Sequence, residues 1–228
     1  MTAFVDRAAA GSALAAALHA YRDRADVLVL GLPRGGVPVA AEVANALHAP
    51  LDIVVVRKLG APGQPELAIG AIASGGVIVI NQNILSAEAN ATEVRAEIHR
   101  QRAELNRREN VYRNGHLPLQ IADRTVILVD DGAATGATML AAVRAARKQG
   151  AKHVIVALPV ASDEAMRALV NEADEVHCLL TPPSFRAVGE WYERFEQTTD
   201  TEVSSLLSQA LHRQWHPIRS TYHEENRQ

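Results

Sequence analysis

A hydrophobic run that ends in two adjacent carboxylates constrains this chain more than any other feature. The run Val126 to Val129 is followed by Asp130 and Asp131, then by five small residues, and then by an Ala-rich pattern that stops at Gly150. This order predicts a buried strand, a tight loop and a helix. Any fold for this chain must therefore place two acidic side chains and a loop of small residues at one end of a buried strand.

The loop after the two aspartates has the composition of a phosphate-binding turn. Its glycines and alanines leave room for successive backbone N–H groups to curl around an anion. Its threonines add hydroxyl donors, and the start of the following helix adds unpaired N–H groups and a positive dipole end. The residues predicted to bind phosphate are Gly132, Ala133, Ala134, Thr135, Gly136, Ala137 and Thr138.

The paired carboxylates indicate a sugar, and two common phosphate loops are excluded. Asp130 and Asp131 would repel each other if merely buried, whereas the two hydroxyls of a ribose could each donate to one of them. A Walker A loop needs Lys where this chain has Ala137. The glycine order of the dinucleotide fingerprint is also absent.

Asp130, Asp131 and the run Thr135-Gly136-Ala137-Thr138 resemble the signature of the type I phosphoribosyltransferases. The resemblance implies an α/β fold with a mainly parallel five-stranded sheet, helices on both faces, a flap hairpin and a C-terminal hood-like segment. It also implies transfer of a phosphoribosyl group from 5-phosphoribosyl 1-diphosphate to a nitrogenous acceptor, with release of diphosphate. Mg²⁺ would assist, and Asp130 and Asp131 would act on it largely through ribose hydroxyls and water.

A glycine-containing loop follows the first predicted strand, 27–31, where the resembling family keeps its diphosphate loop. Arg34 could bind diphosphate with a bidentate fork and is assigned a catalytic role with Asp130 and Asp131. Gly35 and Gly36 are assigned to substrate binding, although two glycines after a strand can also form an ordinary turn. A strained or cis peptide is expected at Arg34-Gly35.

A second pair of cations, Arg57 and Lys58, is expected at the end of a strand over 52–57. The pair resembles the Arg-Lys-x-Gly motif of several family members and is assigned to diphosphate binding. The Lys that follows in the family is replaced here by Ala61, so one cation is missing. A basic strand end that simply faces solvent is the alternative.

Strands that alternate with helices predict one domain over residues 1–218. A hairpin flap is expected within 59–83, a long helix within 86–113, a hood-like segment within 181–212 and a polar tail at 219–228. The helix is expected to be solvated on the domain surface, and the alternative for it is a homodimer contact.

The acceptor is not specified by the residues. Family members that act on 6-oxopurines carry an Asp at the position of Ala134 and a Lys on the strand matching 154–158, and both are absent. Phe185 is assigned to substrate binding, because it could stack on an acceptor ring together with Trp191 and Tyr192. The three aromatic residues could equally close the edge of the sheet.

Composition excludes several other classes of function. The net charge of −3 over 228 residues argues against nucleic-acid binding. No apolar stretch approaches the length of a membrane span, so a cytoplasmic protein is expected, and the lone Cys178 cannot form an internal disulfide. The main alternative function is a regulatory module that binds the donor or a nucleotide without transfer. A phosphatase or nucleotidase would need a different cation pattern.

Overall fold

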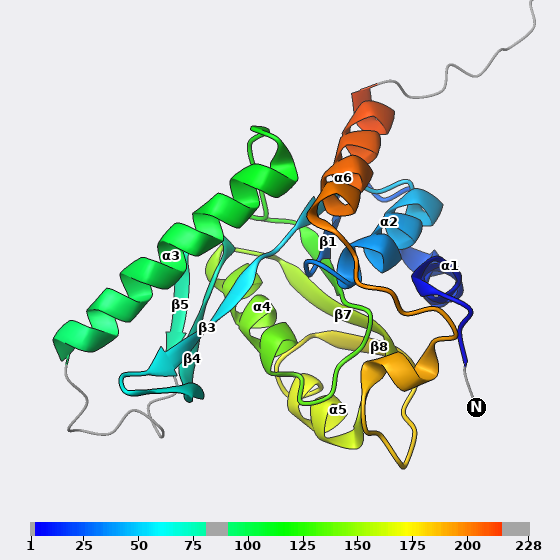
Figure 1. Cartoon of the computed structure of the whole chain (residues 1–228). Coiled ribbons are helices and arrows are strands. Elements are labelled where there is room, and N and C mark those ends of the chain that lie inside the picture. The colour runs from blue at the N-terminus through cyan, green and yellow to red at the C-terminus, as the bar shows by residue number, and fades with distance from the viewer. Residues whose placement is uncertain (1–2, 81–90, 216–228) are drawn as a thin grey trace, which may run out of the picture.

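The computed structural model describes residues 3–80 and 91–215, and a five-stranded sheet lies at its centre (Figure 1). All neighbouring strands are parallel, in the order β2-β1-β6-β7-β8. The strands are β1 (Val27–Gly31), β2 (Leu51–Ile53), β6 (Thr125–Val129), β7 (His153–Val160) and β8 (Glu175–Leu180). The predicted parallel five-stranded sheet is confirmed.

Helices cover both faces of this sheet because alternate strand residues point to opposite sides. Val29 and Ile127 face a core that includes Leu14 and Val203, whereas Leu28 and Leu128 face a second core. The first face is covered by α1 (Arg7–Ala17), α2 (Gly36–Leu47) and α6 (Asp200–Trp215), and the second by α4 (Ala137–Lys148) and α5 (Asp163–Leu169). Short 3-10 turns lie at His19–Tyr21, Ser74–Gly76 and Val188–Trp191.

A separate antiparallel sheet holds the predicted flap. It consists of β3 (Val56–Ala61), β4 (Gln64–Ala73) and β5 (Val77–Ile80), in that order. The predicted hairpin is present, but its base is part of the protein core, since Leu59, Ile69 and Ile72 are buried in the same cluster as β1. Residues 81–83 of the predicted flap lie outside the described residues.

The prediction of one strand over 52–57 was wrong. The chain leaves the parallel sheet after Ile53 and enters the antiparallel sheet at Val56. Val54 and Val55 between them are buried, and Ser74 Oγ accepts a hydrogen bond from the Val55 N–H at 2.8 Å. The sequence could not indicate where the chain passes from one sheet to the other, because the apolar run is continuous and strands of both sheets need the same residue types.

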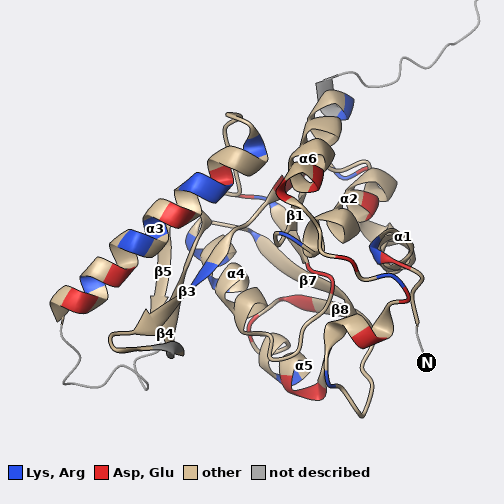
Figure 2. Cartoon of the chain, viewed as in Figure 1, with Lys and Arg blue, Asp and Glu red and all other residues tan. Residues whose placement is uncertain are grey.

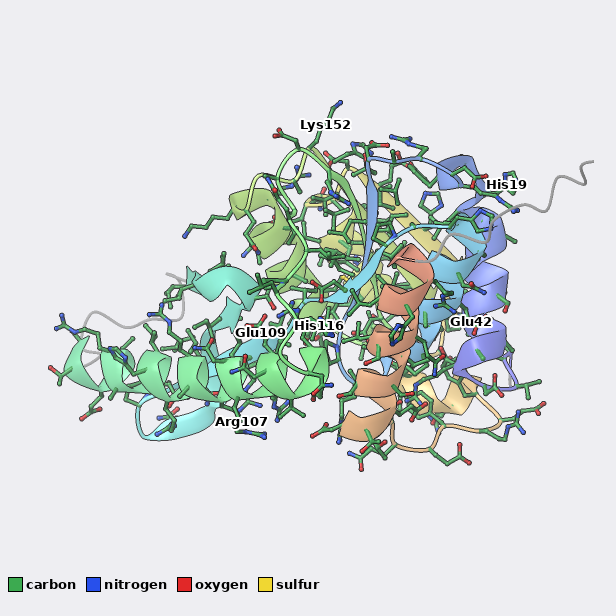
Figure 3. All side chains as sticks on the ribbon, turned by 90° about the horizontal axis from the view of Figure 1, so that it is seen from above. His19, Glu42, Arg107, Glu109, His116 and Lys152 are labelled. Carbon is green, nitrogen blue, oxygen red and sulfur yellow. The ribbon has the colours of Figure 1, made fainter. Side chains whose placement is uncertain are left out.

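The long helix α3 (Ala91–Arg113) lies beside the antiparallel sheet and contacts α6 (Figures 1 and 3). Residues 86–90 of the predicted helix lie outside the described residues. Positive φ angles at Asn114 (49°) and Gly115 (82°) end the helix. Leu105 and Tyr112 are buried, so the helix docks on the domain through few apolar side chains.

The helix α2 begins at Gly36, so Pro38 lies within its first turn. Pro38 is tolerated because the first turn of a helix needs no internal N–H donor. The predicted tail at 219–228 lies outside the described residues, and no described helix is long and apolar enough to span a bilayer.

Candidate functional site

The acidic pair lies at the carboxyl edge of the parallel sheet, directly after β6. The Asp131 N–H donates to Asp130 Oδ1 at 2.9 Å, and both side chains are half-buried. Burial raises the pKa of Asp130 well above its usual value, and the negative charge of Asp131 adds to the shift. Burial also raises the pKa of Asp131, although the neighbouring Arg7 guanidinium opposes this effect. A hydroxyl donor or a cation at Asp130 would therefore stabilise its charged form.

One residue of the predicted phosphate loop is committed to the sheet. The Ala133 N–H donates to the Val160 carbonyl at 3.0 Å, and the Ala133 carbonyl accepts from Ser162 N–H at 2.9 Å. The assignment of the Ala133 N–H to phosphate therefore fails in this structure. Ala133 instead fastens the loop to the end of β7. Gly132 has no room for a side chain, because an added Cβ would lie 2.7 Å from Val188 Cγ1.

The next part of the loop keeps its amides available. The N–H groups of Ala134, Thr135, Gly136 and Thr138 donate to no carbonyl of the described residues, and Ala137 N–H lies 3.5 Å from Thr135 Oγ1. Gly136 has φ 73°, a left-handed conformation that favours glycine. Free amides at the start of α4 form the anion-binding geometry that the sequence predicts.

The glycine loop after β1 packs directly against the acidic pair. A Cβ on Gly35 would lie 2.0 Å from Asp131 Oδ2, and one on Gly36 would lie 2.7 Å from the Val129 carbonyl oxygen. Two loops that lie almost 100 residues apart in the sequence thus meet at one edge of the sheet. A non-proline cis peptide joins Pro33 and Arg34, one bond before the position expected for it.

The predicted cations lie around this edge but point in different directions. Arg34 Nη1 lies 3.6 Å from Asp200 Oδ1 at the start of α6. Arg57 and Lys58 are neighbours in β3, so their side chains leave opposite faces of the strand. Arg57 Nε donates to Gln101 Oε1 of α3 at 2.9 Å, whereas Lys58 is exposed. Their expected place at the end of a strand was wrong, because β3 begins at Val56, and their assignment to diphosphate binding stays a prediction.

Comparison with known proteins identifies the family. Residues 3–194 match the phosphoribosyl transferase domain. The chain belongs to the phosphoribosyl transferase family. It is also similar to TT1426 from Thermus thermophilus, a crystal structure with 44% identity and a TM-score of 0.81 that covers 92% of this chain and 99% of that one. The predicted type I phosphoribosyltransferase fold is confirmed.

Two Mycobacterium tuberculosis proteins, "Putative phosphoribosyl transferase Rv0571c" and "Putative phosphoribosyl transferase MT0597", are each 47% identical to this phosphoribosyl transferase chain over 211 residues. The match covers 92% of the chain and 47% of each relative. The chain therefore spans about half the length of these curated relatives.

Arg7 is a residue of the candidate site that sequence reasoning missed. Its Nε and Nη2 atoms each lie 2.8 Å from Asp131 Oδ2, and its Nη1 donates to the Glu196 carbonyl at 2.7 Å. The guanidinium carbon lies 3.9 Å from the centre of the Phe195 ring. The only local signal was an arginine at the first residue of a helix, where the helix dipole disfavours a cation.

The hood-like segment packs against the acidic pair, and two of the three aromatic residues that could stack on an acceptor ring are now placed. Tyr192 is buried between Phe4 and Phe195, and its hydroxyl donates to the Asp131 carbonyl at 2.6 Å. Burial raises the pKa of Tyr192. Trp191 accepts backbone hydrogen bonds from residues 3 and 4 through its carbonyl. Tyr192 therefore closes the edge of the sheet, whereas Phe185 is half-buried and keeps its assignment as a prediction.

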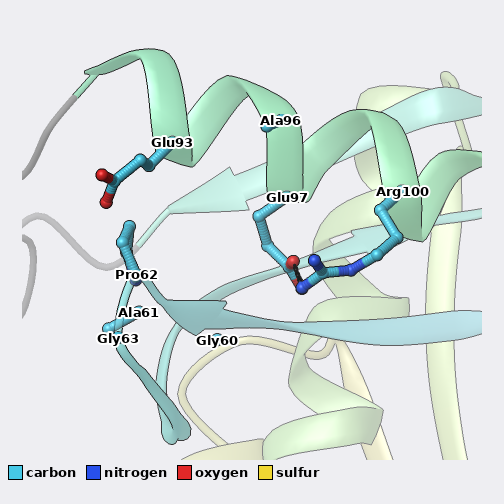
Figure 4. Close-up of a pocket in the computed structure, with 8 residues that line it drawn as sticks. All are labelled: Gly60, Ala61, Pro62, Gly63, Glu93, Ala96, Glu97 and Arg100. Atoms are coloured by element: carbon cyan, nitrogen blue, oxygen red, sulfur yellow. Dashed lines mark hydrogen bonds and ion pairs between the residues drawn. The ribbon is translucent and has the colours of Figure 1, made fainter.

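A pocket of about 370 Å³ lies elsewhere, between the tip of the β3–β4 hairpin and α3 (Figure 4). It is lined by Gly60 to Gly63 and by Glu93, Ala96, Glu97 and Arg100. The buried Glu97 carboxylate binds Arg100 and accepts from Gln101 Nε2 at 2.9 Å. None of the predicted substrate-binding residues lines this pocket, so it is distinct from the site at the acidic pair.

Proposed function

We propose that this protein binds 5-phosphoribosyl 1-diphosphate at the carboxyl edge of the parallel sheet and transfers its phosphoribosyl group to a nitrogenous acceptor. The observation that carries the proposal is the contact of Gly35 with Asp131 beside the free amides of residues 134–138. A sugar-binding carboxylate, a loop for the terminal phosphate and a loop for the diphosphate thus adjoin one another.

In the proposed reaction, the bond from ribose C1 to the diphosphate oxygen breaks, a bond from C1 to the acceptor nitrogen forms, and the acceptor nitrogen releases its proton to water or to the departing diphosphate. Asp130 accepts hydrogen bonds from the ribose hydroxyls and so orients the sugar. The amides of Ala134 to Thr138 hold the 5-phosphate, and Arg34 meets the negative charge that grows on the leaving diphosphate. The hood-like segment excludes water from the cation-like carbon.

The described residues fit Mg²⁺ as a partner of the donor. Among them no group of three or more His, Cys, Asp or Glu side chains could hold a metal ion. Asp130 has a raised pKa and no ion-pair partner among the described residues, so a cation nearby would offset its charge. Mg²⁺ would thus be held near Asp130 through water and donor oxygens, and when bound it would neutralise charge on the diphosphate.

A binding module without transfer activity is the second candidate. It is favoured by Ala134, which offers no carboxylate to take the acceptor proton, and by the ion pair that already engages Asp131. The acceptor itself stays unassigned. Val154 to Leu158 are fully buried and include no Lys. The absence of a Lys from this strand is one of the two reasons to disfavour a 6-oxopurine as the acceptor.

The two candidates separate in one experiment. The protein is incubated with the donor, Mg²⁺ and a panel of purine, pyrimidine and other nitrogenous acceptors, and diphosphate release is measured. Release that depends on one acceptor supports the transferase. Tight donor binding without release for any acceptor supports the binding module, and the absence of donor binding contradicts both.

A further inference from the structure

One face of α3 carries charged and polar residues toward the same edge of the domain. Gln101, Glu104, Arg108 and Tyr112 are spaced by three, four and four residues, so they lie on one face of the helix. Charged bands run along the whole of α3 in Figure 2. We call these four residues the α3 face.

Contacts join one end of the α3 face to Arg57 of β3 and the other end to Asp200 at the start of α6. At one end, Gln101 Oε1 accepts from Arg57 Nε at 2.9 Å. At the other end, Tyr112 Oη donates to Asp200 Oδ1 at 3.1 Å, and Arg34 Nη1 lies 3.6 Å from the same oxygen. The eleven residue-to-residue steps from Gln101 to Tyr112 correspond to about 16 Å along a helix axis. The α3 face therefore bridges the gap between Arg57 and Arg34.

Positive charge exceeds negative charge along this bridge. Glu104 is shared by two guanidinium groups, because Arg107 Nε and Arg108 Nε each lie 2.8 Å from its carboxylate. Arg34 lies 3.6 Å from Asp200, and among the described residues the only side chain hydrogen-bonded to Arg57 is the neutral Gln101 amide. The nearby Glu97 and Glu109 are engaged by Arg100 and Arg113, respectively. Within the described residues, four arginines thus share two carboxylates.

Arg57 is the arginine most affected by this excess of positive charge. Its side chain is half-buried, and burial lowers its pKa. The positive charges of Arg108 and Arg107 lower this pKa further, whereas the Glu104 carboxylate opposes them. Charged groups that lose water need a partner of opposite charge. Arg108 and Arg34 keep about a third of their side-chain surface exposed, 36% and 35%, so an anion can reach both.

We propose that the α3 face, with Arg34 and Arg57 at its ends, is a binding site for diphosphate groups, and that Arg108 is its central residue. The site rests on the proposed function where the diphosphate belongs to the phosphoribosyl donor. A free diphosphate-bearing effector would be recognised by the same chemistry. The α3 arginines supply cations that β3 lacks, since the chain has Ala61 where the resembling family has a Lys.

Binding calorimetry on the whole protein tests the proposal with three probes: inorganic diphosphate, 5-phosphoribosyl 1-diphosphate and ribose 5-phosphate. Arg108→Gln should weaken diphosphate and donor binding by roughly tenfold or more, as expected for a lost charge-assisted contact. It should leave ribose 5-phosphate binding unchanged, because that ligand has no diphosphate. Arg108→Lys should recover part of the loss.

Arg95→Gln is the matched control, since Arg95 is exposed on the same helix and, among the described residues, bonds only to the Ala91 carbonyl. Equal diphosphate affinity for Arg108→Gln and Arg95→Gln would overturn the proposal. If diphosphate competes with the donor, the site serves the donor; if both bind together, it serves an effector. Wild-type protein that binds diphosphate but neither sugar phosphate would contradict the proposed function and leave this site standing.

Discussion

The two sides of the candidate site are built in different ways. On one side, residues 130–138 present backbone amides and two carboxylates that are consecutive or nearly so in the sequence. On the other side, the α3 face and Arg57 present side-chain charges from elements that are more than 40 residues apart. The first side is specified by local sequence and the second by tertiary packing. Substitutions on the two sides should therefore differ in whether they change mainly the free energy of unfolding or mainly the affinity for the donor.

The largest effect on stability is expected on the α3 side. Leu105 is 1% exposed and belongs to the core that also contains β1. Leu105→Ala should lower the free energy of unfolding by about 2–5 kcal/mol because it leaves a cavity. Urea unfolding measures the loss, and Arg95→Ala on the exposed surface should change it by less than about 0.5 kcal/mol. Similar curves for the two variants would mean that α3 folds independently of the core.

Substitutions of the acidic pair should weaken donor binding rather than lower stability. Asp130→Asn combined with Asp131→Asn should keep the fold and weaken donor binding by about 2–4 kcal/mol, through the loss of two charge-assisted hydrogen bonds. Donor titration by calorimetry measures the change, and circular dichroism checks the fold. Unchanged affinity would show that the acidic pair does not hold the sugar.

Arg7 should link binding to stability on the acidic side. Arg7→Gln leaves the Asp131 carboxylate without its cation and should lower the free energy of unfolding at neutral pH by about 1–3 kcal/mol. Arg194→Gln removes a more exposed ion pair with Asp6 and should cost only about 0.2–1 kcal/mol. Adding Asp131→Asn to Arg7→Gln should restore part of the loss, and full additivity of the two substitutions would show that the ion pair carries no energy.

The smallest expected effect is a gain in stability. The folded-state pKa of Asp130 is raised by burial and by Asp131, so the unfolded chain loses this proton first as pH rises. Stability is therefore lost from about pH 4, the ordinary Asp range, up through the raised pKa, and it stays reduced above that pKa.

Asp130→Asn removes this penalty and should raise the melting temperature at pH 7–8, by about 2–4 °C for each kcal/mol gained. The gain should shrink as pH falls toward 4. Thermal unfolding over a series of pH values measures it, and a lower melting temperature at pH 8 would show that Asp130 is stabilised by its surroundings when charged.

The contrast between the two sides also explains what could be predicted from sequence. Strand β6, its acidic pair and the start of α4 were predicted because their signals are local: an apolar run, small residues and a helical pattern. The change of sheet between Ile53 and Val56 was missed, because a buried linker and a buried strand have the same composition. The Ala133 N–H is occupied by a hydrogen bond to the Val160 carbonyl of a neighbouring strand, and nothing in the loop sequence itself indicates that bond.

The contributions of Arg7 and Tyr192 could not be predicted, for a related reason. Each acts on Asp131 from a position more than 60 residues away in the sequence. Their partners depend on where α1 and the hood-like segment dock. The separation of Arg57 from Lys58 follows from strand alternation, which became predictable only once β3 was assigned to its own sheet.

The junction of residues 3–7 with residues 191–196 has a consequence for synthesis. Backbone hydrogen bonds join Phe4 to Trp191 and Glu193, and Arg7 reaches the Glu196 carbonyl only after that residue exists. In a growing polypeptide, β6 and its loop can be completed once residue 162 is available, but the support behind Asp131 is assembled only when residue 196 emerges. A ligand that depends on this support would therefore stabilise only chains that already include residue 196.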